Sequence, residues 1–310
     1  MTSIEAVSVH VPAERAPVAA RLRPYETDEN RLRLYERFYG FSEISVDTSG
    51  TLTGLLVAAL EGLPELASLR HRVRYVLHAR SMPVAAPYPL NPLREACESV
   101  GLDGAATFSV TQHACASPLL AVDLAGRLLA DDGIPDARAV VLTGDKTFTA
   151  AARIIPDSAV MGEASTAVLV RAGGSHDRML SYATSTHGRY KDGPWMSPDI
   201  GAAFQSAYAG ALADVISAAV RTAGLAMNDI ALILPHNVNQ LSWLRVLRMI
   251  GVAADHLFLD NLPRLGHCFG SDPFVNLRSA RQLGRLRRGD RYIMTAVGLG
   301  ATFSAMVFEH

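Results

Sequence analysis

The stretch that decides the fold runs Phe108-Ser-Val-Thr-Gln-His-Ala-Cys115-Ala-Ser-Pro-Leu-Leu-Ala-Val122. Its first residues resemble a β-strand, and the residues after Pro118 have the spacing of an amphipathic helix. Cys115 lies on the small-residue turn between them, at the N-terminus of the expected helix. The unpaired N–H groups and the positive dipole end of a helix favour a thiolate over a thiol there. The segment therefore indicates either a nucleophilic cysteine or a buried, inert one.

The composition is that of an ordinary globular chain. Its 310 residues are 49% hydrophobic and 19% charged, which is ample for a core. The 29 Lys and Arg residues nearly balance the 30 Asp and Glu residues, so we expect no nucleic-acid or anionic membrane partner. No apolar run reaches the roughly 18 residues of a membrane span, and no secretory leader pattern opens the chain. We therefore expect a cytoplasmic protein.

The three cysteines, Cys97, Cys115 and Cys268, are an odd and scattered set. This pattern argues against a disulfide framework and lacks the paired spacing of a zinc site, so we expect reduced thiols and no metal. The sequence also contains no Gly-x-Ser-x-Gly elbow, no His-Glu-x-x-His and no phosphate-binding loop. Serine-hydrolase, zinc-hydrolase and NTPase functions are therefore excluded.

Several apolar, β-branched runs are followed by helical patterns, which is typical of an α/β protein with covered strands. The first residues alternate like an opening strand. Further strands are expected at residues 74–78, 107–111, 139–143, 167–170, 230–234 and 292–296. Helices are expected at residues 51–62, 93–100, 118–130, 203–222, 240–250 and 272–286.

The second half of the chain repeats the architecture of the first. The Cys115 turn and its helix correspond to Gly266-His-Cys-Phe-Gly-Ser271 and its helix. The period of roughly 150 residues indicates duplicated halves and not a solenoid. We expect a division near Gly173, with one half at residues 1–172 and the other at residues 173–310. The two corresponding helices should then face a shared centre.

Four motifs in order carry a resemblance to a known family. They are Cys115, His236-Asn-Val-Asn239, Arg264-Leu-Gly-His267 and Gly298-Leu-Gly300. The chain resembles the thiolase superfamily, and most closely β-ketoacyl-acyl-carrier-protein synthase III, from about Gly104 to the end. The resemblance implies an α/β, thiolase-like five-layered αβαβα fold made of two similar halves. The N-terminal hundred residues match this family poorly.

The resemblance also implies roles for these residues. Cys115 would accept the acyl group of an acyl-CoA or acyl-carrier-protein thioester, with no other cofactor, and His236 and His267 would act in the second half-reaction. His267 stands where the synthase III pattern has asparagine, which gives a Cys-His-His set. The backbone N–H groups of the Gly298–Gly300 turn would form an oxyanion hole, with Asn239 as a supporting residue.

Three functions remain open from the sequence. The first, which the resemblance favours, is decarboxylative condensation of the acyl group with a malonyl-type thioester in specialised, polyketide-like or fatty-acid-like biosynthesis. The second is transfer of the acyl group from Cys115 to an O or N nucleophile. The third is a non-catalytic partner of an active paralogue, which a pocket closed by His113 or Leu299 would favour. The family resemblance implies a homodimer, in which the strand at residues 107–111 pairs across a two-fold axis.

Overall fold

The computed structural model describes residues 1–26, 28–149 and 152–310. Nine of its strands form one sheet in the order β11-β12-β13-β10-β1-β9-β6-β4-β5, and four short strands pair separately as β2-β3 and β7-β8. The first group of strands is β1 (Thr2–His10), β4 (Val73–Ala79), β5 (Ala106–Val110), β6 (Arg138–Gly144) and β9 (Ser165–Ala172). The second group is β10 (Arg178–Thr186), β11 (Ile230–Leu234), β12 (Arg291–Gly298) and β13 (Thr302–Glu309).

The two groups of strands have the same topology. If the strands of the first group are numbered by their order in the chain, they lie side by side in the sheet in the order third, second, fourth, fifth, first. In the second group, Leu257 makes a parallel bridge to Ile233 of β11 in the position of the third strand, and the other four strands follow the same arrangement. The groups meet at β1 and β10, whose register is the single pair Ser3 and Arg178. The exact division of the chain into two halves, between residues 172 and 173, stays a prediction.

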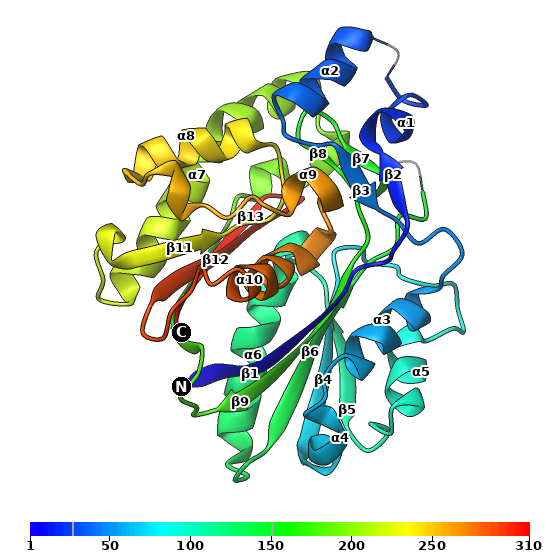
Figure 1. The fold of residues 1–310 in the computed structure, drawn as a ribbon, viewed down its shortest axis with the longest axis vertical. Coiled ribbons are helices and arrows are strands. Elements are labelled where there is room, and N and C mark those ends of the chain that lie inside the picture. Colours follow the sequence, from blue (N-terminus) through cyan, green and yellow to red (C-terminus); the bar gives the residue numbers. More distant parts are fainter. Residues whose placement is uncertain (27, 150–151) are drawn as a thin grey trace.

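The main helices form three layers around the two groups of strands (Figure 1). The outer helices α3 (Leu52–Glu61) and α5 (Pro92–Ser99) pack on the first group, through a buried cluster that includes Leu56, Val76 and Val140. The outer helices α7 (Pro198–Thr222) and α8 (Gln240–Ile250) cover the second. Between the groups lie α6 (Ser117–Asp132) and α10 (Asp272–Gln282). The expected five-layered α/β fold is therefore confirmed.

The N-termini of the two central helices meet. A single 3₁₀ turn, Ala114–Ala116, precedes α6, and another, Phe269–Ser271, precedes α10. Gly270 allows their close approach, since an added Cβ would lie 2.5 Å from Pro118 Cγ. The facing arrangement expected from the sequence is therefore present, although the α-helices begin at Ser117 and Asp272, just after the reactive side chains.

The remaining elements lie mostly beside the N-termini of the central helices, at the top of Figure 1. The strands are β2 (Arg15–Pro17), β3 (Glu43–Ser45), β7 (Ile154–Ile155) and β8 (Ala159–Val160). The helices are α1 (Val18–Leu22), α2 (Glu29–Arg37), α4 (Leu66–Leu69) and α9 (Leu262–Leu265). Strand β3 packs on α9, and Ser42 N–H donates to the carbonyl of Pro263. The poorly matching N-terminal region thus supports the segment that carries His267.

Two helices differ in length from the sequence expectation. Helix α10 ends at Gln282, four residues early, and is followed by Gly284 with a left-handed φ of 65°, which terminates helices readily. Helix α7 begins at Pro198, five residues early, because proline is well suited to a first helical turn. By length and apolarity α7 would be long enough to cross a membrane, but it packs on β10 and β13 as an outer-layer helix.

Candidate active site

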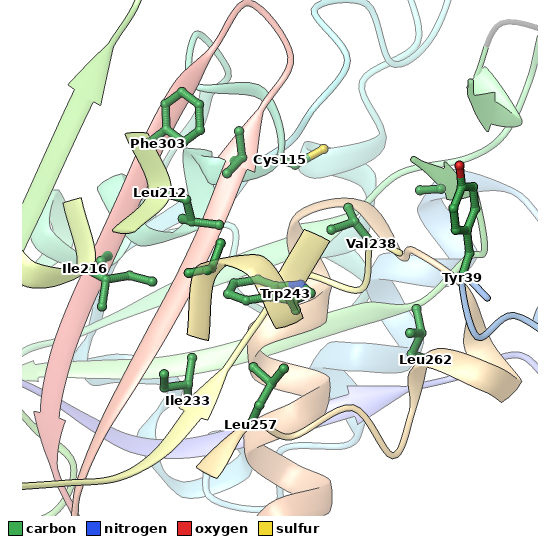
Figure 2. Close-up of a cluster of buried hydrophobic side chains, with 14 of the residues drawn as sticks. Tyr39, Cys115, Leu212, Ile216, Ile233, Val238, Trp243, Leu257, Leu262 and Phe303 are labelled. Carbon is green, nitrogen blue, oxygen red and sulfur yellow. The ribbon is translucent and has the colours of Figure 1, made fainter. Parts of the chain in front are cut away.

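Cys115 lies on a strained turn at the centre of the molecule. The residue before it, Ala114, has a φ of 45°, which is uncommon for a residue with a side chain. Cys115 is 3% exposed and belongs to a buried apolar cluster with Val238 and Trp243. Figure 2 shows its sulfur at the edge of that cluster. Non-glycine residues in this region of φ and ψ occur often at functional sites, where the surrounding structure holds them in place.

His267 lies between Cys115 and a buried carboxylate. Its Nδ1 hydrogen-bonds to Oδ2 of Asp272, and the ring also hydrogen-bonds to the sulfur of Cys115. Burial disfavours the charged imidazolium, but the negative charges of Asp272 and Cys115 outweigh this effect and raise the pKa of His267 to about 10. Cys115, His267 and Asp272 thus form a connected triad that can hold and pass one proton.

Asp272 is held in place by backbone and side-chain donors. It is fully buried, at the first position of α10. Oδ2 accepts from the backbone N–H of Asn237 at 2.6 Å, and Oδ1 accepts from the backbone N–H of Cys268 at 2.8 Å and from Asn237 Nδ2 at 3.2 Å. A buried carboxylate is stable only with such partners. These bonds orient Asp272 toward His267.

His236 follows β11 and faces the same centre, but its environment differs. Its ring centroid lies 6.1 Å from that of His267, and its Nε2 lies 2.7 Å from the hydroxyl of Tyr208. Burial, and then the positive charge of His267, lower the pKa of His236 to about 3. One imidazole of the pair is therefore cationic at neutral pH and the other is neutral.

A second buried carboxylate lies on the other side of Cys115. Ser81 Oγ donates to the sulfur at 3.3 Å, and the backbone N–H of Ser81 donates to Oδ2 of Asp145 at 3.0 Å. Burial raises the pKa of Asp145 to about 6, although N–H donors from Ser81 and Met82 oppose that rise. Ser81 is thus a polar contact of the Cys115 sulfur that the sequence analysis did not identify.

The glycine turn after β12 lies against the nucleophile turn. A Cβ on Gly298 would lie 1.9 Å from the carbonyl oxygen of His113, so only glycine fits at this distance. Gly298 and Gly300 each line a cavity that Cys115 also lines. Their donation to an oxyanion stays a prediction.

Asn239, expected as a supporting residue, has a defined structural task. Its Oδ1 caps α8 by accepting from the backbone N–H of Ser242 at 2.8 Å, and its Nδ2 donates to the carbonyl of Asp157 at 3.1 Å. Both ends of the amide are therefore used within the protein. Asn239 supports the wall of the site and holds the start of α8.

Cys115 lies on the walls of two cavities. The first has a volume of about 410 Å³ and is lined by both histidines, by Tyr208 and by polar residues that include Gln205, Ser242 and Arg245. The second has a volume of about 940 Å³, and its wall is mostly apolar, including Met82, Val84, Phe148 and Trp195. Leu299 lies on both walls and leaves Cys115 accessible to each cavity. In the part of the chain that the structure describes, Leu299 closes neither cavity, so this observation does not favour the alternative of a non-catalytic partner.

Known proteins with related sequences match parts of the chain. Residues 220–310 match the family model for the C-terminal part of 3-oxoacyl-[acyl-carrier-protein] synthase III. A β-ketoacyl-[acyl-carrier-protein] synthase III from Roseiflexus sp. (strain RS-1) is 36% identical over 91 residues, which are 29% of this chain and 27% of the relative. The enzyme of the same name from Sphingopyxis alaskensis is 28% identical over 215 residues, 63% of this chain and 64% of the relative. Both matches span less than two thirds of the relative.

Solved structures match the whole chain. The acyltransferase ChlB3 superposes with a TM-score of 0.85 at 18% identity, covering 99% of this chain and 97% of that one. The synthase III of Aquifex aeolicus VF5 gives 0.81 at 16% identity and covers 100% of both chains. The chain has the fold of these solved structures, and its residues 220–310 match the C-terminal part of the synthase III family. OleA of Xanthomonas campestris has the same fold, with a TM-score of 0.83 at 15% identity.

The structure brings together the three residues that the sequence predicted to be catalytic, Cys115, His236 and His267. It adds Asp272 and Tyr208. Asp272 has a weak sequence signal, as a carboxylate five residues after His267 at a helix start. Tyr208 has none, because it reaches His236 from a helix 28 residues upstream. Among the residues described, no cluster of three or more His, Cys, Asp or Glu side chains is arranged to hold a metal.

Proposed function

We propose that this chain moves an acyl group from a CoA or carrier-protein thioester to Cys115 and then to an oxygen or nitrogen nucleophile. The observation that carries the proposal is the position of His267 between the sulfur of Cys115 and the buried carboxylate of Asp272. This arrangement is that of a nucleophile, a base and a group that orients the base.

The first half-reaction loads the enzyme. The Cys115 thiolate attacks the thioester carbonyl carbon, and the resulting oxyanion collapses as the carbon–sulfur bond to the donor breaks. The imidazolium of His267 gives its proton to the departing thiolate. The acyl group is then bound to Cys115, and His267 is left neutral, because the proton has left and the thiolate charge that favoured the imidazolium is gone.

The second half-reaction transfers the acyl group. Neutral His267, still oriented by Asp272, takes the proton of the acceptor as its oxygen or nitrogen attacks the acyl-cysteine carbonyl carbon. The new bond forms, the bond from carbon to Cys115 sulfur breaks, and the thiolate and imidazolium are restored. Because both cavities include Cys115 in their walls, donor and acceptor parts can each approach the same sulfur. We assign the larger, apolar cavity to the acyl chain.

Decarboxylative condensation is the competing function. It needs two donors that converge on the oxygen of a thioester enolate. His236 Nε2, the natural second donor, already bonds to Tyr208. This contact places transfer to oxygen or nitrogen ahead of condensation, in reverse of the order that the sequence favoured. The likeness to ChlB3, described as an acyltransferase, fits either reaction.

Intact-protein mass spectrometry tests the proposal. We expect one acyl group on the wild type after incubation with a panel of acyl-CoA thioesters, the same addition on Cys268→Ala, and none on Cys115→Ala. An added alcohol or amine should then remove the acyl group as an ester or amide. Release of carbon dioxide from malonyl-CoA with formation of a new carbon–carbon bond would contradict the proposal and support condensation.

A further inference from the structure

Ser81 brings a hydroxyl to the sulfur of Cys115 from the segment that follows β4. Its Oγ donates to the sulfur at 3.3 Å. Ser81 lines the larger cavity, whereas His267, which also hydrogen-bonds to the sulfur, lines the smaller one. The sulfur is therefore contacted by groups of two kinds. The imidazolium of His267 can give up its proton, and the alcohol of Ser81 keeps its proton at neutral pH.

The backbone fixes the position of this hydroxyl. The backbone N–H of Ser81 donates to Asp145 Oδ2 at 3.0 Å, and that of Met82 donates to Oδ1 at 3.3 Å. Asp145 directly follows β6, which pairs in parallel with β4, and it is 3% exposed. Neither of these bonds uses the side chain of Ser81. A substitution of that side chain therefore leaves both anchors of the segment in place.

The strength of the bond from Ser81 depends on the charge of the sulfur. A thiolate is an anionic acceptor, and hydrogen bonds to ionised groups are roughly twice as strong as neutral ones. In an acyl-cysteine the sulfur is neutral and, like that of a thioether, a weak acceptor. The hydroxyl then has the Asp145 carboxylate within reach, but that carboxylate already accepts two backbone N–H groups. Ser81 thus stabilises the free thiolate more than it stabilises the acyl-enzyme.

We propose that Ser81 is a catalytic residue that stabilises the Cys115 sulfur as a leaving group. This inference rests on the acylation of Cys115 in the proposed function and concerns the step that ends it. Once the acceptor has attacked the acyl-cysteine carbonyl carbon, the carbon–sulfur bond breaks and its electron pair passes to the sulfur. The O–H of Ser81 donates to the sulfur as this charge develops and keeps its proton, while His267 takes the proton of the acceptor.

Ser81 should affect the two half-reactions in opposite senses. Loading consumes the thiolate, so the bond from Ser81 weakens as the sulfur attacks. Discharge restores the thiolate, so the same bond strengthens as the sulfur leaves. Loss of the hydroxyl should therefore slow discharge without slowing loading, and should shift the equilibrium toward the acyl-enzyme. A merely structural role for Ser81 would instead slow both directions equally and leave this equilibrium unchanged.

Exchange with CoA tests Ser81 without an alcohol or amine acceptor. Wild type and Ser81→Ala are incubated with free CoA and the acyl-CoA that loads the wild type, at known ratios, and the acylated fraction is followed by intact-protein mass spectrometry. We expect Ser81→Ala to raise the equilibrium constant of loading at least about fivefold, with slower return of the acyl group to CoA and loading no slower than in wild type. Ser99→Ala is the control and should match the wild type, because the Ser99 hydroxyl bonds to the carbonyl of Ala96 in α5.

Ser81→Thr keeps the hydroxyl and should restore the wild-type equilibrium. An unchanged equilibrium constant in Ser81→Ala, or the same shift in both variants, would overturn the role of Ser81 and leave the proposed function standing. Exchange with CoA as expected, but transfer to neither alcohol nor amine, would overturn the proposed function and leave the role of Ser81 standing. A wild type that no acyl-CoA of the panel loads would overturn both.

Discussion

At the scale of single residues, the neighbours of His267 and His236 give the two imidazoles different protonation states. His267 contacts a carboxylate and a thiol, which favour its proton, whereas His236 contacts a phenol and a cationic ring, which do not. The same side chain is thus cationic in one position and neutral in the other at neutral pH. Opposite shifts of neighbouring pKa values commonly mark such a division of roles.

Asp272→Asn should separate these roles experimentally. Removing the carboxylate charge should lower the pKa of His267 from about 10 toward its ordinary value of 6.5. The wild-type imidazolium persists through neutral pH and is lost as pH rises through about 10, whereas the variant should lose it between about pH 6 and 7. Loading of Cys115 should therefore fall at least about tenfold at pH 8 and less at pH 5.5.

The measurement is the pH profile of Cys115 acylation, with thermal unfolding followed in parallel. Asp255→Asn is the matched control, because the Asp255 side chain is 81% exposed. A profile of Asp272→Asn that falls equally at every pH would indicate a structural role for the carboxylate.

At the scale of elements, the sequence predicted most of the parts that bury a continuous apolar face. The runs in β4, β6, β9 and β12 are nearly all buried and were found. Strand β10 was missed because its residues are mostly half-buried or exposed and polar. Helix α2 was missed because charged residues dominate Glu29–Arg37, and tertiary contacts of Leu32 and Tyr35 hold it.

The same distinction between local sequence pattern and tertiary contacts applies to the candidate site. Cys115, His236 and His267 were predicted because each lies in a short motif at an element boundary. The contacts of Tyr208 and Ser81 depend on tertiary packing of α7 and of the segment after β4, which no local spacing records. What the sequence could not provide is therefore the set of partners that decides what each histidine does.

Gly298→Ala tests the contact between β12 and the nucleophile turn. The new Cβ would lie 1.9 Å from the His113 carbonyl oxygen, so one of the two segments must move. Because backbone cannot give way as a flexible side chain can, we expect a lower melting temperature and at least about tenfold slower loading of Cys115. Gly188→Ala, with no neighbour within 4 Å of the added Cβ, is the control. Loading at the wild-type rate in Gly298→Ala would refute the contact.

At the scale of the whole molecule, the outer edges of the two groups of strands differ. The second group ends in the single bridge at Leu257, whereas the first ends in the full strand β5, which pairs with β4 on one side. Three of the five residues of β5 are exposed. Nearby along the chain, Val84, Tyr88 and Leu90 are 72%, 98% and 58% exposed. An open edge strand together with exposed apolar residues is a feature that proteins usually cover.

We expect a second copy of the chain to cover this edge, with β5 paired to its symmetry mate. Sedimentation at micromolar concentration should then show a dimer. Thr107→Arg places two like charges close together across the two-fold axis and should shift the equilibrium toward monomer by about tenfold or more, because buried charges without partners are costly. Thr222→Arg, an equally exposed change at the end of α7, should leave the dimer intact. A wild type that sediments as a monomer, or a dimer unaffected by Thr107→Arg, would place the partner elsewhere or exclude it.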